Sequence, residues 1–598
     1  MREKRIGFCA GMISVVSFLA LSVTFGAEAG AASRLVSQMG IWPMGAVGLF
    51  WFYQTWLKNE DPFRPGVLWF LAVFFAGVAT LAQSFAAVGT TELLTQSRGA
   101  LLKTGLYFLG RVLLYFAGMR RVYQWLRCEG FEKKQRAAPL WISLAGALLV
   151  CWLPYFVAVF PGVVSNDSVT QLGEIFGLSP LSNGNPVFQT FLIWLCQRMM
   201  QPAFGADGAV ALYCIVQGLC MAVLLGYLLL QMLRSNAPRW LVILSFLLYG
   251  FCPVFPLYAF CVGKDTNFAM AVLFFSLMVW RVLCFPSGKK IPRRLWAGLS
   301  LSAVMVMLLR NPGVYLVAGT LVLLLLQLRF SVAREGRAWR LPAVALLILV
   351  SLYGGLHGIL LPSLYIQPMP ETEEYSLPLQ QVARVVVSQP ERLQPEDVAI
   401  ISAVLDYGQI KEAYNGELSD PVKLLWNEKA TSAEKQAFFG LWLRLLPQYP
   451  FTYFSATFHN TYGYLCPGYV STIKPTLLIG RQKRTDDLDP YFQFSISPHS
   501  ERLKTGMGKL MEQPVFRMVI APGLYGCITL FALTVLLFSK RRYLLIPAFP
   551  AMFSLLGALF SAVNGYFRYA MPLYMCAPLL LVLCAQALRL QKFENEKE

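Results

Sequence analysis

Long apolar runs alternate with short polar connections along most of this chain. About 20 helical residues cross a hydrocarbon layer of about 30 Å, and most of the runs are close to that length. We therefore predict an all-α polytopic membrane protein with about 14 transmembrane helices. The expected spans cover residues 6–26, 40–57, 66–87, 104–119, 138–160, 207–231, 239–258, 267–284, 295–310, 313–329, 341–361, 514–538, 543–562 and 571–588.

Two apolar stretches allow more than one interpretation. The first run, 6–26, is longer than the apolar core of a signal peptide, which favours an uncleaved first span over a cleaved signal. A full span at 186–200 would invert every later loop and place the basic cluster 289–294 outside. We therefore expect 186–200 to form a short helix that lies at the outer interface or re-enters the membrane.

The polar positions divide the chain into four regions. We expect an N-terminal four-helix membrane module at 1–137 and a membrane core at 138–361, whose first outer loop is 161–206. A mainly helical extracytoplasmic domain follows at 362–513, and a three-helix membrane segment at 514–598 completes the chain.

Composition agrees with a membrane protein. Of the 598 residues, 56% are hydrophobic and 14% are charged, whereas soluble domains carry roughly 25% charged residues. The mean hydropathy is +0.54. These values exclude a soluble enzyme and a disordered chain.

The net charge of +19 marks one side of the membrane. The outer stretch 362–512 is nearly balanced, with 17 acidic and 14 basic residues, so the basic surplus lies in the membrane portion and its short loops. With both termini in the cytoplasm, the basic clusters all fall on the cytoplasmic side, as the positive-inside rule requires. We expect a multi-pass protein of the plasma (inner) membrane, embedded in membrane lipid, and no nucleic-acid partner.

A few charged residues on the outer side are exceptions to this charge bias. Asp167 follows a span in PGVVSNDSVTQ, and Lys264 with Asp265 precedes one in GKDTNF. Arg310 closes the outer turn in RNPGVY, and Arg568 lies in NGYFRYAMP. A carboxylate there suits a general base, and cations suit a phosphate. The structural alternatives are helix capping by Asn166 or Asp167, a snorkelling Lys264 with Asp265 as the helix N-cap, and an ordinary helix end at Arg310.

Two further outer residues are weaker candidates. Arg384 lies in LPLQQVARVV at the start of the large outer domain, and its planar guanidinium fits phosphate. His459 lies in FHNTYGY, in an aromatic stretch that suits a membrane interface. We predict no resident cofactor and no metal ligands, because no P-loop, HExxH or Cys/His cluster is present; participation of a divalent metal stays open.

These motifs, with SNGNPVFQT at 182–190, resemble a group of bacterial membrane proteins of the DUF6020 type over roughly 138–588. That group in turn looks like the GT-C glycosyltransferases, of the family 39 protein mannosyltransferase type, in the first outer loop and the helix pattern. The resemblance implies a GT-C-like fold, an active-site acid at Asp167 and a polyprenyl-phosphate sugar donor. It also implies a His-Pro pair where this chain has Asn185 followed by Pro186.

Our leading hypothesis is a membrane glycosyltransferase, in which Asp167 is catalytic. Lys264, Asp265, Arg310, Arg384, His459, Arg568 and Asn185 are the candidate substrate-binding residues. The enzyme would move a sugar, with inversion, from a polyprenyl-phosphate donor to an envelope glycan, lipid or protein at the outer leaflet. The alternatives are a transporter or flippase for lipid-linked sugars, and a non-catalytic structural relative.

Overall fold

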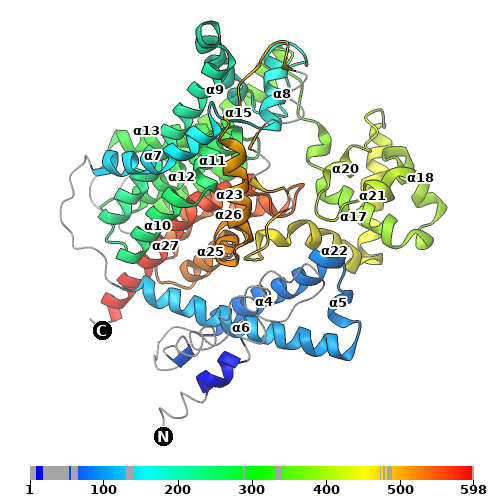
Figure 1. Cartoon of the computed structure of the whole chain (residues 1–598), viewed down its shortest axis with the longest axis horizontal. Helices are drawn as coiled ribbons and strands as arrows, with labels where there is room; N and C mark the ends of the chain where they lie inside the picture. The colour runs from blue at the N-terminus through cyan, green and yellow to red at the C-terminus, as the bar shows by residue number, and fades with distance from the viewer. Residues whose placement is uncertain are drawn as a thin grey trace.

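The structure is a computed structural model of the whole chain, shown in Figure 1. It describes residues 9–15, 17, 53–54, 65–128, 140–286, 290–330, 340–471, 473–475, 479–480 and 488–595. The described part is mainly helical and contains almost no sheet. The expected spans at 6–26 and 40–57 lie mostly outside the described residues.

Nine helical segments in the described part are long and apolar enough to cross a membrane. They are α4 (Pro65–Val88), α6 (Arg98–Leu126), α7 (Leu140–Val159), α9 (Val187–Arg234), α12 (Lys264–Leu283), α14 (Gly313–Phe330), α15 (Arg340–Gly355) with η1 (Leu356–Leu360) and α16 (Leu361–Ser363), η8 (Arg542–Ala548) with α26 (Phe549–Leu559), and α27 (Phe567–Asn595). Three shorter helices complete the bundle: α10 (Arg239–Phe251), α13 (Arg293–Leu309) and α25 (Pro522–Leu537). The prediction of a helical multi-pass membrane protein is confirmed, while the total of about 14 spans stays a prediction.

Element α9 consists of two helices that meet at Gly205. The first matches the short helix expected at 186–200, and the second covers the span expected at 207–231. Gly205 interrupts the helical backbone between the two parts with φ of 64°. Glycine adopts this left-handed conformation without a Cβ clash, so the sequence places the break there.

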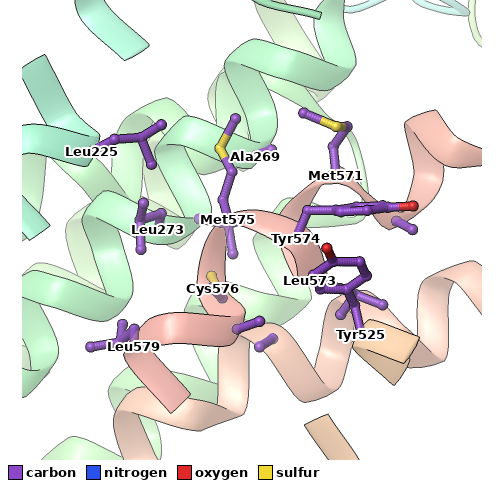
Figure 2. Packing of buried hydrophobic residues seen from close by; sticks show 14 of the residues in the cluster. Leu225, Ala269, Leu273, Tyr525, Met571, Leu573, Tyr574, Met575, Cys576 and Leu579 are labelled. Atoms are coloured by element: carbon purple, nitrogen blue, oxygen red, sulfur yellow. The ribbon is translucent and has the colours of Figure 1, made fainter. Parts of the chain in front are cut away.

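Helix α27 occupies the centre of the bundle. It packs against α12 and α25, and Figure 2 shows Tyr574 of α27 beside Tyr525 of α25, with their ring centres 4.0 Å apart. Within its membrane stretch, 89% of the residues are buried inside the protein, the largest share among the described spans. A helix that is apolar on every side is typical of such a core position.

Small helices outside the spans connect and cover the bundle. Those between the spans are α5 (Glu92–Thr95), α8 (Asn166–Ile175) and α11 (Val254–Ala259), and those before α25 are α23 (Ser500–Glu512) and α24 (Pro514–Ile520). Figure 1 shows α17, α18, α20 and α21 as a separate group beside the bundle.

This separate group belongs to the expected outer domain and has its own core. Its elements are η2 (Glu371–Glu373), α17 (Ser376–Ser388), η3 (Pro390–Arg392), α18 (Pro395–Val404), η4 (Tyr407–Gln409), α19 (Ile410–Ala413), α20 (Asp420–Lys423), α21 (Ser432–Gln448), α22 (Pro450–Thr461) and η5 (Tyr462–Tyr464). Leu379, Phe438 and Tyr453 are almost fully buried in one cluster. Thr431 accepts from the backbone N–H of Glu434 and so caps α21. The predicted mainly helical character of this region is seen in its described residues.

Candidate functional site

A short parallel strand pair brings the first outer loop to the start of α12. Strand β1 (Val163–Val164) pairs with β2 (Cys261–Val262). The hydroxyls of Ser165 and Ser168 both donate to the carbonyl of Val262, which ties the start of α8 to the same strand. Asp167 on α8 therefore lies beside Lys264, although about 100 residues separate them in sequence.

Asp167 forms two ion pairs at this point. One carboxylate oxygen lies 2.9 Å from Nη1 of Arg568 and the other lies 3.2 Å from Nζ of Lys264. Helix α8 begins at Asn166, and its N-cap Ser165 makes no side-chain capping hydrogen bond. The capping alternative for Asp167 is therefore wrong: its carboxylate binds two cations instead.

Asp265 is the second carboxylate of the cluster. One of its oxygens lies 3.7 Å from Nε of Arg568 and the other 3.9 Å from Nη1 of Arg310. These contacts are longer than those of Asp167, and Asp265 is only 7% exposed. Helix α12 begins at Lys264 with Gly263 as its N-cap, so Asp265 does not cap it.

Two aromatic rings hold the arginines in place. The guanidinium carbon of Arg310 lies 5.4 Å from the centre of the Tyr569 ring, and that of Arg568 lies 5.0 Å from the same ring. Arg568 is also 5.1 Å from the ring of Tyr566. These distances allow cation–π attraction, so the ring of Tyr569 helps to hold two positive charges at one site.

Asn185 joins the same cluster through the lysine. Nζ of Lys264 donates to Oδ1 of Asn185 over 2.7 Å. An amide oxygen accepts this bond without carrying charge or titrating. Six of the eight predicted site residues therefore converge: Asp167, Asn185, Lys264, Asp265, Arg310 and Arg568. We call this group the charged cluster.

The carboxylates and Arg568 line a cavity of about 440 Å³. Its walls also include Ser165, Tyr258 and Thr266 from the membrane core. Asp420 and Ile473 come from the outer domain, so that domain covers one side of the cavity. The volume is large enough for a small polar group such as a sugar, by comparison with ligand pockets of about 300–1,000 Å³.

Electrostatics keep Asp167 ionised. Burial on its own would raise the pKa of Asp167, but the charges of Arg568 and Lys264 outweigh burial and hold that pKa well below its usual range. Asp167 is thus a carboxylate at every physiological pH. Its two cations also make it a weak proton acceptor until one of them binds something else.

Glu174 is a nearby acid that the sequence reasoning missed. It lies on the same helix as Asp167. Burial raises its pKa to about 7, although a hydrogen bond from the Ser182 backbone and the charge of Lys264 both act to lower that pKa. It does not line the cavity.

Arg384 and His459 do not join the cluster. Nη2 of Arg384 donates to the carbonyl of Gly89 over 2.6 Å, which ties the outer domain to the end of α4. The His459 ring packs against Gly89 and Gly416, where a methyl group would collide with it. Burial and the charge of Arg384 lower the pKa of His459 to about 4. In the structure both residues contribute to the contact between the outer domain and the end of α4.

Other cavity residues were also missed in the sequence. Tyr566 and Tyr569 flank Arg568 within the motif NGYFRYAMP, so alternating aromatics around a lone outer arginine were an available signal. Asp420 lies far from the membrane core in sequence, and no local pattern around it indicated a site.

A second, apolar cavity of about 970 Å³ runs between α9, α12 and α13. We call it the apolar groove. At one end it reaches Asn267, one turn after Lys264 on α12, and Leu309, the residue before Arg310. The groove therefore begins next to the cations of the charged cluster.

Metal-ligating groups do not gather in the described residues: no three His, Cys, Asp or Glu side chains there lie close enough to hold a metal ion. Both cluster carboxylates are paired with basic side chains instead.

The fold and the site together define a multi-pass helical membrane protein with a cluster of paired acidic and basic side chains. The chain belongs to the family of unknown function DUF6020, whose family model matches residues 177–598. That match contains Asn185, Lys264, Asp265, Arg310 and Arg568 and begins after Asp167. No curated protein and no solved structure matches the chain.

Proposed function

We propose that this protein is an inverting membrane glycosyltransferase with a GT-C-like fold. It would transfer a sugar from a polyprenyl-phosphate donor to a cell-envelope glycan, lipid or protein. The reaction would take place at the outer leaflet of the plasma membrane, with both termini in the cytoplasm. The observation that carries the proposal is the charged cluster, which lines a polar cavity and adjoins the apolar groove.

The charge of the cluster fits a phosphodiester. Two carboxylates face three cations, which leaves a net charge of +1. A sugar linked to a lipid through one phosphate carries a single negative charge, which would neutralise the site. Arginine and lysine both bind phosphate through charge-assisted hydrogen bonds.

Phosphate binding would also free the base. In the structure Lys264 and Arg568 both form ion pairs with Asp167. When the donor phosphate binds these cations, the carboxylate of Asp167 loses part of their attraction and becomes a better proton acceptor. The site would therefore activate its base only when the donor is present.

The residues of the charged cluster account for the proton and the leaving group of the proposed reaction. The acceptor hydroxyl oxygen attacks the anomeric carbon while Asp167 takes the hydroxyl proton. The bond from that carbon to the phosphate oxygen breaks, and its electron pair leaves with the polyprenyl phosphate. Lys264, Arg310 and Arg568 stabilise the charge that develops on this leaving group, and attack opposite the leaving group inverts the anomeric centre.

The apolar groove gives the polyprenyl chain a place to bind. Its walls are mostly aliphatic and aromatic side chains, such as Leu192, Val216 and Phe274. Burial of apolar chain surface contributes roughly 25 cal/mol per Å². A phosphate at Lys264 and Arg310 would place the attached chain at the groove's near end.

The transporter alternative is less well supported. It predicts ionisable residues along a path at mid-membrane depth. The charged residues that line the groove are Arg234, Arg281 and Arg294, and all lie within the last or first few residues of their helices. Among the described residues, the middle of the groove is lined without a charge, which suits an apolar chain.

The test is a transfer assay with purified protein in liposomes. A panel of radiolabelled polyprenyl-phosphate hexoses is supplied with envelope extract, and release of polyprenyl phosphate is followed. We expect turnover with at least one donor and its loss in Lys264→Gln. Comparison of envelope glycans and lipids between deletion and wild-type cells identifies the acceptor. An unchanged envelope, together with no turnover of any donor, would refute the proposal.

A further inference from the structure

A third cavity, of about 610 Å³, lies at the opposite end of α12 from the charged cluster. Helix α12 has 20 residues, which at about 1.5 Å per residue separates its two ends by about 30 Å, the thickness of a hydrocarbon core. We call this third cavity the inner pocket. It lies at the end where the chain's basic clusters gather.

Helices α9, α12, α13 and α27 line the inner pocket, and all of them except α13 supply one arginine. Arg234 is the last residue of α9, Arg281 lies near the end of α12, and Arg589 lies in α27. Of the described residues that line the pocket, none is acidic. The pocket thus gathers positive charge without an acidic residue in its walls.

Two of these arginines lack an acidic partner in the described part of the chain. Arg281 donates to the hydroxyl of Tyr227, which is neutral. Arg234 is exposed and forms no ion pair with a described acid. Nearby, Nε2 of Gln231 is buried and has no hydrogen-bond acceptor. A buried donor without an acceptor is costly, so the pocket offers a hydrogen-bond donor and positive charge to an anion.

Ordinary helix-end arginines reach into water singly and line no shared cavity. Here Arg234 and Arg281 line two cavities at once, the inner pocket and the far end of the apolar groove. An anionic group in the pocket would therefore lie next to apolar walls. A molecule with a phosphate head and an apolar tail matches both surfaces.

We propose that the inner pocket binds the phosphate headgroup of an anionic phospholipid from the adjoining leaflet. Arg234 and Arg281 would bind the phosphate oxygens, Gln231 would donate a further hydrogen bond, and part of an acyl chain would lie against the groove's inner end. Basic pockets between transmembrane helices are suited to such headgroups. This site lies at the other end of the apolar groove from the sugar-transfer site, and the proposal does not depend on sugar transfer.

The test measures lipid binding to the purified full-length protein in detergent. Phosphatidylglycerol and phosphatidylcholine are titrated separately, and binding is read by native mass spectrometry and by the shift in Tm. We expect phosphatidylglycerol to bind more tightly than phosphatidylcholine and to raise Tm. Arg234→Gln and Arg281→Gln should each weaken phosphatidylglycerol binding about tenfold, the loss of one charge-assisted contact.

Arg293→Gln is the matched control, because Arg293 lies at the same end of the bundle, is exposed and lines neither cavity. It should bind phosphatidylglycerol as the wild type does. Arg234→Gln decides the result if Arg281→Gln misfolds, since Arg234 is exposed. Wild-type binding by Arg234→Gln, or equal binding of the two lipids, overturns the proposal. Inorganic phosphate or glycerol 3-phosphate that displaces phosphatidylglycerol at equal concentration would show a soluble anion site and overturn the lipid assignment.

Discussion

Replacement of Asp167 by Asn separates a catalytic role from a structural one. The amide keeps the shape of the side chain and removes its charge. Arg568 and Lys264 lose their ion pairs at 2.9 and 3.2 Å. Each retains a second partner, since Arg568 is 3.7 Å from Asp265 and Lys264 donates to Asn185 over 2.7 Å.

The structure sets the expected size of the loss in stability and of the loss in rate. Removal of one partner of a fully buried ion pair costs about 3–5 kcal/mol. The Asp167 side chain is 22% exposed and its cations keep other partners, so we expect a loss of about 1–3 kcal/mol in stability. Loss of a general base lowers the rate by about 10²–10⁴, which corresponds to about 3–5 kcal/mol in the activation free energy.

Donor binding should change in the opposite direction. The variant raises the net charge of the cluster from +1 to +2 and frees both cations for phosphate. The polyprenyl-phosphate sugar donor should therefore bind Asp167→Asn as tightly as the wild type or more tightly, while turnover falls. Binding is measured by titration of the purified protein, and turnover by release of labelled polyprenyl phosphate.

Glu174→Gln is the control for this experiment, because it removes another carboxylate from α8 that does not line the cavity. Its turnover should stay close to that of the wild type, because Glu174 does not line the cavity and glutamine keeps the size of its side chain. The reasoning fails if Asp167→Asn keeps full turnover, or if its donor binding is lost together with turnover.

Two further predictions concern pH and topology. Because the folded protein holds His459 neutral with a pKa of about 4, against 6.5 for an ordinary histidine, the unfolded chain binds the extra proton as pH falls from about 6.5 to 4. Stability should fall by about 3 kcal/mol over that window, and His459→Gln should remove this part of the pH dependence of Tm while His499→Gln keeps it. In a cysteine-free background, an impermeant maleimide should label Thr170→Cys on intact cells and Lys540→Cys only after the membrane is opened; the reverse pattern would invert the proposed orientation.

The helical membrane class could be predicted from the sequence because it depends on local properties. Apolar runs long enough to cross a bilayer form helices whose backbone hydrogen bonds are satisfied within each run. The two helices expected at 186–200 and 207–231 follow from the same reasoning, and the structure contains both. The sequence pattern did not mark the residue that separates them, which the backbone geometry places at Gly205.

The sequence by itself also determined the residue types available for a site. Outer acids and bases stood out because the charge bias made them exceptions, and this singled out Asp167, Lys264, Arg310 and Arg568. It could not select among the candidates, since Arg384 stood out for the same reason. Charge and position along the chain do not state which side chains meet in space.

Only the tertiary structure decided which candidates meet. The pairing of β1 with β2 sets Asp167 beside Lys264, and the central position of α27 brings in Arg568. The same packing places Arg384 and His459 against the end of α4, away from the cluster. The physical reason is that ion pairs act over a few ångströms, so their partners are fixed by contacts between elements distant in sequence, whereas helices and spans are fixed by neighbours along the chain.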